Sequence, residues 1–312
     1  MPLLSVIVCT HNPRADHLDS ALAALRRQSL PAEQWELVII DNASTEPLSN
    51  CLDLSWQPRA RIVREDMLGI GHARVRGMRE AAADLLLFVD DDNVLAPDYL
   101  ERAVEISREF PFVGVWGGNV TPDFEVEPHP SLRPYVKLLA LREVTRDVWA
   151  NTDSAGVMEA CAAGMCFRRS VAEHYCRELA ADPRRKEIGS KGRSMMRGED
   201  SDFAHSALEA GFGWGQFGRL SLTHLIPAER VSEDYLLRLH EGISASVILL
   251  NYLWGRQHNV PVQDWREKLK HFLRFFLQQK LERKFYLAGR RGVRAAQRTI
   301  LQLEGRGTLT SK

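Results

Sequence analysis

The stretch that decides the fold is LLLFVDDDN, residues 85–93, where an uninterrupted apolar run meets three consecutive aspartates. A short apolar run without alternation is typical of a strand that is covered on both faces, as in a parallel sheet. Ligands bind outside the carboxyl ends of such strands. Asp90, Asp91 and Asp92 therefore stand where a binding site is expected, and a bound cation would offset the repulsion between them.

The first hundred residues alternate between strand and helix patterns. Apolar runs at 4–10, 36–41 and 60–65 predict strands, and residues 15–28 and 71–83 carry apolar residues at helical spacing. This alternation indicates parallel βαβ units and an α/β fold. Polar side chains follow each predicted strand, so we expect them to gather at one edge of the sheet.

Three interpretations of the aspartate cluster are open. It is a solvated start of a loop, or it holds a divalent cation, or it supplies general acid and base chemistry. Mg²⁺ and Mn²⁺ prefer oxygen ligands, and they commonly share their coordination with substrate phosphates. The cluster alone does not decide between these interpretations.

Charge and cysteine usage bound the cellular context. The 312 residues carry no formal net charge, but residues 266–306 contain twelve Lys or Arg against three Asp or Glu. The five cysteines form no C-x-x-C pair, which predicts reduced thiols. No signal-peptide pattern opens the chain and no apolar run is long enough to span a bilayer, so we expect a cytoplasmic protein.

The basic segment has two interpretations. The favoured one is a pair of helices that packs on the catalytic body with a solvated basic face. The alternative is a basic amphipathic helix that attaches the protein peripherally to the inner face of the plasma membrane. A nucleic-acid partner is not expected, because no aromatic or motif context accompanies the charge.

Five motifs occur in a fixed order along residues 4–230. They are SVIVCTHNPR (5–14), LVIIDNAST (37–45), GIGHARVRG (69–77), FVDDDNVLAPDYL (88–100) and RGEDSDFAHSALEAGF (197–212). This ordered set resembles the inverting family 2 glycosyltransferases with the GT-A fold. The resemblance implies an α/β, Rossmann-like, mostly parallel central sheet flanked by helices, with a helical C-terminal extension. It also implies a nucleotide-sugar half at 1–117, an acceptor-binding and catalytic half at 118–230, and an extension at 231–312.

The resemblance further assigns roles to single residues. Asp200 is the general base, and Asp92 and His224 are the ligands of Mg²⁺ or Mn²⁺. Gly118 and Glu199 are expected near the transferred sugar. The residues implied in nucleotide binding are Thr10, Asn12, Arg14, Asp41, Arg74, Asp90 and Asp91.

Two of these roles have structural alternatives. His224 could cap a loop, and Glu199 with Asp200 could complement the dipole of a following helix.

The implied function is metal-dependent, inverting transfer of a sugar from a nucleoside diphosphate donor to an acceptor hydroxyl. Asp41 matches an aspartate that hydrogen-bonds the base, so UDP- or dTDP-sugars are favoured and GDP-sugars are possible. The acceptor is a glycan, a lipid-linked intermediate or a small molecule. The rival functions are a sugar-nucleotide nucleotidyltransferase, which would need a glycine-rich first loop, and an inactive nucleotide-binding homologue. CTHNPR after the first strand has no glycine, and G-x-G-x-x-G of a dehydrogenase is absent from that place.

Overall fold

The computed structural model describes residues 1–152, 161–189, 195–256 and 279–305, and these residues belong to two compact units. The first, here called the sheet unit, comprises Met1–Glu127, Leu139–Ala181 and Glu199–Ala228. The second, the helical unit, comprises Pro128–Leu138, Asp182–Gly198 and Glu229–Lys312.

The sheet unit follows the predicted alternation of strands and helices. Its elements in chain order are β1 (Leu4–Thr10), α1 (Ala15–Arg26), β2 (Trp35–Asn42), β3 (Ala60–Glu65), α2 (Ile70–Glu80), β4 (Leu85–Val89), β5 (Asn93–Leu95), α3 (Tyr99–Glu109), β6 (Val113–Phe124), β7 (Val148–Ala150), β8 (Cys166–Arg168), α4 (Arg169–Ala181), α5 (Glu199–Glu209) and β9 (Gly213–Ile226).

Within the described part of the chain, nine strands form one sheet in the order β3-β2-β1-β4-β8-β6-β9-β5, and β7 pairs with β9. The first four strands of this order are parallel to one another. β8 is antiparallel to both of its neighbours, and β6 and β9 run parallel. The predicted α/β, mostly parallel sheet is confirmed.

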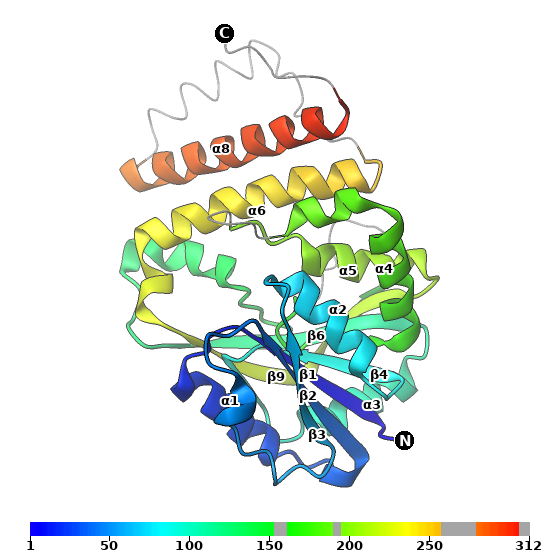
Figure 1. Ribbon diagram of the computed structural model, residues 1–312. Coiled ribbons are helices and arrows are strands. Elements are labelled where there is room, and N and C mark those ends of the chain that lie inside the picture. The colour runs from blue at the N-terminus through cyan, green and yellow to red at the C-terminus, as the bar shows by residue number, and fades with distance from the viewer. Residues whose placement is uncertain (153–160, 190–194, 257–278, 306–312) are drawn as a thin grey trace. The chain divides into compact units, whose positions relative to one another are not determined.

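Helices cover both faces of the sheet, which explains why its strands do not alternate in sequence. Alternate residues of β1, Leu4, Val6 and Val8, pack in a cluster with residues of α1 and α3. Ile7 and Cys9 point the other way, into a cluster with residues of α2, α4 and α5. Figure 1 shows α2, α4 and α5 on one side of the sheet and α1 on the other. Both faces are therefore dry, and the edge formed by the strand ends is left for polar residues.

The division predicted between residues 117 and 118 falls inside β6. The nucleotide-sugar half and the acceptor half would therefore contribute strands to the same sheet. Their separation remains a prediction about which ligand each half binds.

The helical unit is built on two long helices, α6 (Glu233–Leu253) and α8 (Lys280–Leu303), which run in parallel. Lys284 pairs with Glu233 near the start of both helices, and Arg291 pairs with Glu241 about two turns later. α8 buries Phe285, Ala288, Gly292, Ala296 and Ile300, at spacings of three and four that define one face of a helix.

In the sequence, Ser232 and Gly242 predict a helix that begins after a serine N-cap and ends at the glycine. The predicted start is confirmed by α6, but the predicted end is wrong. Ser232 is the N-cap, and its hydroxyl accepts a hydrogen bond from the Tyr235 N–H at 3.3 Å. The helix then continues through Gly242 to Leu253. A Cβ at Gly242 would lie 2.2 Å from the Met195 carbonyl oxygen, so close packing of the backbone explains this glycine.

No helix among the described residues is long and apolar enough to cross a membrane. Residues 266–278 and Arg306 of the predicted basic segment lie outside the described residues.

Candidate active site

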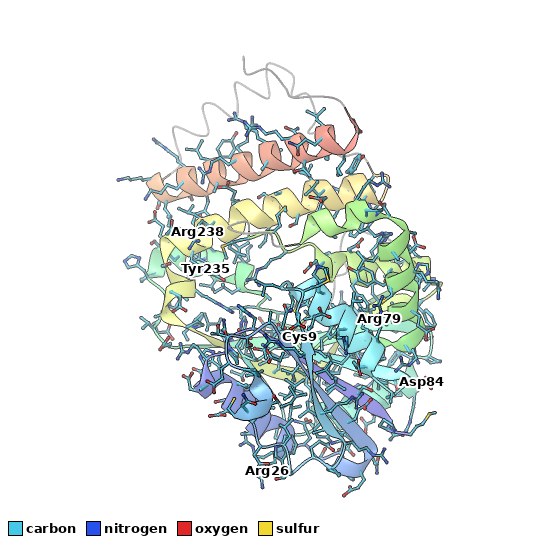
Figure 2. All side chains as sticks on the ribbon, in the orientation of Figure 1. Cys9, Arg26, Arg79, Asp84, Tyr235 and Arg238 are labelled. Atoms are coloured by element: carbon cyan, nitrogen blue, oxygen red, sulfur yellow. The ribbon has the colours of Figure 1, made fainter. Side chains whose placement is uncertain are left out.

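The carboxyl ends of β1, β2 and β4 lie at one edge of the sheet, because these strands are adjacent and parallel. Thr10 is opposite Asp41 in the register, and its hydroxyl donates a hydrogen bond to the carboxylate of Asp91. In Figure 2, Cys9 marks this edge at the end of β1, and Asp84 marks the opposite end of the sheet, just before β4. The prediction that polar strand ends gather at one edge is confirmed.

The loops after β1 and β2 are tied to each other in unusual backbone conformations. Asn12 has a φ of 47° and Ala43 a φ of 56°. The Asn12 N–H donates to Ser44 Oγ at 3.0 Å, and Asn12 Oδ1 accepts from the Thr45 N–H at 2.8 Å. A left-handed conformation costs a residue with a side chain about 1–2 kcal/mol, so these loops are held in a shape that local preference does not favour.

Arg14 lies at the outer end of the first loop. Its side chain is 42% exposed, and it forms ion pairs with Asp16 at 2.7 Å and Glu125 at 3.2 Å. These pairs orient the guanidinium at the rim of the strand-end edge, and its contact with the nucleotide remains a prediction.

Asp41 is a buried carboxylate with several donors around it. Oδ1 accepts from the Ser44 N–H at 3.0 Å, and Oδ2 accepts from the Leu48 N–H at 3.1 Å and from Arg64 Nη1 at 2.9 Å. Although burial opposes it, these hydrogen bonds lower the pKa of Asp41. The residue is therefore held as an anion, with only 2% of its side chain exposed.

Asp92 and His224 meet through the sheet. β5 pairs with β9 so that Asn93 lies opposite His224, and this register brings His224 Nε2 to 3.3 Å from Asp92 Oδ2. The other ring nitrogen, Nδ1, donates to the Leu139 carbonyl at 3.2 Å. A histidine that ligates a metal commonly donates its second N–H to such an acceptor.

These two side chains fit a cation that is shared with substrate. Among the described residues, no group of three or more His, Cys, Asp or Glu side chains could hold a metal ion by itself. Mg²⁺ is usually bound by one or two carboxylates together with substrate phosphates and water. One carboxylate and one oriented imidazole therefore match a site that is completed by a diphosphate.

Arg74, on α2, lies between carboxylates that come from distant parts of the sequence. Nη1 donates to Asp200 Oδ1 at the start of α5, and Nη2 lies 3.9 Å from Asp90 Oδ1. The second oxygen of Asp200 accepts from the Ala162 N–H at 3.1 Å. Although burial opposes it, the charges of Asp200 and Asp90 raise the pKa of Arg74, so the guanidinium stays charged.

Asp90 is the most crowded member of the aspartate cluster. Partial burial raises its pKa to about 6, Arg74 opposes this shift, and the nearby Asp92, Asp200 and Asp91 increase it. The arrangement places more carboxylates than cationic side chains at this edge.

Glu199 and Asp200 are the first residues of α5, as the dipole interpretation expects. Both line a small recess between α2, α4 and α5. The other residues that line this recess are Gly71, Arg74, Met78, Phe88, Met165, Tyr175 and Phe203.

Gly118 is a residue of the same sheet. It is buried in β6, where a Cβ would lie 2.4 Å from the Leu220 carbonyl oxygen of β9. Close packing of the two strands explains the glycine, and its predicted place beside the sugar stays a prediction.

Three groups that position the site were not predicted from the sequence. Arg64 holds Asp41, the Ala162 N–H holds Asp200, and the Leu139 carbonyl holds His224. Only Arg64 had a signal in the sequence, because it lies near the end of the predicted strand at 60–65. That strand pairs with the strand that ends at Asp41. Ala140, next to Leu139, has a φ of 63°, a strained conformation that sequence does not reveal.

A comparison with protein-family models decides the family. The model described as "Glycosyl transferase family 2" matches residues 5–175, more than half of the chain. The chain belongs to glycosyl transferase family 2. The matched range contains the strand-end loops, the aspartate cluster and Arg74, but it ends before Asp200 and His224.

Two glycosyltransferases are similar to part of the chain. A validoxylamine A glucosyltransferase of Streptomyces hygroscopicus subsp. jinggangensis is 34% identical over 153 residues, which cover 47% of this chain and 36% of that protein. Glycosyltransferase AglE of Haloferax volcanii is 26% identical over 123 residues, which cover 38% of this chain and 40% of that protein. The matches thus span between about a third and two fifths of the length of these relatives.

Solved structures extend the likeness over nearly the whole chain. TarS 1–349 of S. aureus in complex with UDP-GlcNAc superposes with a TM-score of 0.54 at 15% identity, covering 98% of this chain and 93% of that one. Mannosyltransferase PcManGT of Pyrobaculum calidifontis, in complex with GDP-Man and Mn²⁺, superposes with a TM-score of 0.53 at 17% identity, covering 99% and 76%. At these identities the likeness shows the fold alone, and it confirms the predicted GT-A class.

Proposed function

We propose that the family 2 chain transfers a sugar from a nucleoside diphosphate to an acceptor hydroxyl by direct displacement, with inversion at the anomeric carbon. The observation that carries this proposal is the placement of Asp200. Its carboxylate lies beside Arg74, which also faces Asp90 at the strand-end edge. A single base next to a site for a leaving diphosphate is what direct displacement requires.

Asp200 is the group proposed to remove the acceptor proton. One of its oxygens accepts from Arg74 and the other from the Ala162 N–H, so its orientation is fixed before substrate arrives. The hydroxyl oxygen forms the new bond to the anomeric carbon as its proton passes to the carboxylate. The bond between that carbon and the diphosphate oxygen breaks, and the nucleoside diphosphate leaves.

The leaving group develops negative charge, and the site has cationic means to stabilise it. Asp92 and His224 would hold Mg²⁺ or Mn²⁺, which would act as a Lewis acid toward the diphosphate. Arg74 is a charged hydrogen-bond donor at the same edge. Its interaction with the leaving diphosphate would become stronger as negative charge develops there. Thr10 and Asn12 order the loops on the nucleotide side.

Neighbouring proteins support nucleotide-sugar donors in general. The TarS structure holds UDP-GlcNAc and the PcManGT structure holds GDP-Man with Mn²⁺. UDP- or dTDP-sugars remain the favoured donors for this chain, and GDP-sugars remain possible. The acceptor is a glycan, a lipid-linked intermediate or a small molecule, and the similarity to a validoxylamine A glucosyltransferase supports testing validoxylamine A among the small molecules.

A donor panel tests the proposal. The chain is incubated with UDP-, dTDP- and GDP-sugars, MnCl₂ and a set of saccharide and cyclitol acceptors, and the products are analysed by NMR. We expect an α-linked donor to give a β-linked product, with loss of transfer after chelation of the metal. Retention of configuration, or transfer that chelation leaves unchanged, would contradict the mechanism.

The two rival functions give different products. A nucleotidyltransferase would release pyrophosphate from a nucleoside triphosphate and a sugar 1-phosphate. An inactive homologue would bind nucleotide without turnover. A pyrophosphate assay on the same preparation separates both from the proposed transferase.

A membrane contact through the helical unit is a second proposal, and α8 supports it. The face opposite its buried residues carries Lys280, Arg283, Arg290, Arg294 and Arg298, and all but Arg283 are exposed. Leu287, 46% exposed, lies within this stripe. A cationic stripe of this kind fits an anionic lipid surface, at about 1 kcal/mol for each basic residue.

Vesicle binding tests this contact. The triple substitution of Arg290, Arg294 and Arg298 by Gln should reduce binding to phosphatidylserine vesicles by about 100-fold. Substitution of Arg26, Arg27 and Arg79 by Gln, in the sheet unit, is the matched control and should leave binding unchanged. Equal binding of both variants, or no binding by the parent chain, would favour the solvated face.

A further inference from the structure

Residues 139–142 of the sheet unit lie beside the proposed metal ligand. The Leu139 carbonyl accepts the hydrogen bond from His224 Nδ1. Arg142 forms a β-bridge with Val120 of β6, in which the N–H of each residue donates to the carbonyl of the other at 3.0 Å. The backbone of Arg142 is therefore fixed to the same sheet that carries His224.

The Arg142 side chain lies near the loop that holds the proposed base. In this loop the Cys161 thiol lies 4.0 Å from the Ala140 carbonyl oxygen, so the two segments are in contact. Cys161 precedes Ala162, whose N–H donates to Asp200. Burial raises the pKa of the Cys161 thiol, the positive charge of Arg142 opposes this shift, and the charge of Asp200 increases it. Arg142 and Asp200 are therefore both close to this thiol.

One nitrogen of the Arg142 guanidinium lacks an acceptor. Nη1 is buried, and no described residue accepts a hydrogen bond from it. Arg74 differs, because its Nη1 donates to Asp200. A buried charged donor without an acceptor destabilises the free chain, and an anionic ligand would supply the missing acceptor.

We propose that Arg142 binds a carboxylate or phosphate group of the acceptor and so holds the acceptor hydroxyl at Asp200. The planar guanidinium matches the oxygens of both groups. Its place beside the loop that holds Asp200 favours the acceptor over the donor, because the metal ligands and Arg74 are already proposed to stabilise the leaving diphosphate. The inference rests on the proposed sugar transfer and adds the chemical class of the acceptor, an acidic or phosphorylated saccharide.

The neighbouring carboxylates make this cation necessary for such an acceptor. Asp200 and Asp90 both act on the Cys161 thiol, so their charges extend to the place where Arg142 lies. Without Arg142 they would repel an anionic group there. With it, an acidic saccharide should bind more tightly than a neutral one.

Binding of small saccharides tests this class without turnover. UDP, dTDP and GDP are first titrated into the full chain by calorimetry, with MgCl₂ because Mn²⁺ would broaden NMR lines, and the nucleotide that binds most tightly is kept bound. Glucuronate, glucose 6-phosphate and glucose are then compared by saturation-transfer difference NMR. The parent should bind glucuronate or glucose 6-phosphate at least about tenfold more tightly than glucose, as expected for one charge-assisted contact.

Three variants separate the charge of Arg142 from the stability of the fold. Arg142→Met should bind all three saccharides with similar affinity, and Arg142→Lys, which keeps the charge but not the planar fork, should keep part of the preference. Arg142→Met should also melt at the parent temperature or above it, because it removes a buried donor that has no acceptor in the described part of the chain. Arg146→Met, at an exposed position a few residues later, is the matched control and should keep the full preference.

The outcomes separate the inference from the function on which it rests. A preference that survives in Arg142→Met overturns the role of Arg142, and so does a nucleotide-bound parent chain that binds no acidic saccharide more tightly than glucose. Loss of nucleotide affinity by about tenfold or more in Arg142→Met overturns it too, because the anion would then be the donor diphosphate. A parent chain that binds none of the nucleotides removes the proposed function itself.

Discussion

The sheet unit and the helical unit use charge in different ways. In the sheet unit, acidic and basic side chains from distant strands and helices meet at one edge, as in Arg74 with Asp200 and Arg64 with Asp41. In the helical unit, α6 and α8 pair a few charges along their length, and α8 carries most of its basic residues on an outward face. Chemistry requires fixed and mutually oriented charges, so it belongs to the sheet unit, while the helical unit offers a surface.

The largest effect should follow from Asp200→Asn. A small effect would contradict the assignment of the chemistry to the sheet unit. Loss of the proposed base should lower kcat by about 10²–10⁴-fold. Binding of nucleoside diphosphate with Mn²⁺ should stay within a few-fold of the parent, because Asp200 is not proposed to contact the nucleotide. The measurements are steady-state kinetics and calorimetry on the same preparations.

Asp84→Asn is the matched control for that substitution. Asp84 precedes β4 at the other end of the sheet, and its side chain is fully exposed. This variant should transfer sugar at the parent rate. A near-normal rate for Asp200→Asn would require another base.

An intermediate effect should follow from Gly242→Val, which tests the helical unit alone. The side chain would meet the backbone of Met195, and overpacking of this kind costs about 1–3 kcal/mol. Thermal unfolding should shift to lower temperature. Val247→Ala, at an exposed position of the same helix, should not shift it.

Hydrogen exchange measured by mass spectrometry can show where Gly242→Val acts. Protection should fall in α6 and α8 and stay unchanged in β1 and β2. Equal loss of protection in both units would show that they unfold together. The two units would then not differ in stability.

The smallest effect should be a difference in how acid weakens the two units. Burial lowers the pKa of His240 in α6 below 6.5, so its contribution to stability is present above pH 6.5 and is lost as the pH falls through its folded value. Glu36 in β2 is also buried, but hydrogen bonds from Ser5, Ala82 and Arg61 lower its pKa below 4.5. Its contribution is present above pH 4.5 and is lost only below that value.

Hydrogen exchange between pH 7.5 and 4 can resolve this order. The helical unit should lose protection first, and His240→Gln should flatten its dependence on pH. Glu36→Gln should flatten the loss in the sheet unit below pH 4.5. Loss of protection in the sheet unit before the helical unit would contradict the assignment.

The repeating parts of the fold were predictable from the sequence, because local periodicity determines them. The bounds predicted for β1 and β3 match those observed, and the ends of α1 and α2 differ by two or three residues. The end of α6 was mispredicted, because a glycine that normally ends a helix is used here for close packing of the backbone.

The residues of the candidate site could be predicted from the sequence, but the contacts between them could not. The motifs indicated Arg74 and Asp200 separately, yet no local pattern could predict that residues 126 positions apart form an ion pair. Arg64 was missed because its role depends on the register between β2 and β3. The role of Gly118 stays a prediction, because a glycine required by strand packing looks the same in sequence as one required by a ligand.

One crystal structure would test the central claim most directly, that of the chain soaked with UDP and MnCl₂ and measured at the manganese absorption edge. We expect an anomalous peak bound by Asp92 and His224, with the diphosphate completing the coordination. A nucleotide bound elsewhere, with no manganese at the carboxyl ends of β1 and β4, would contradict it.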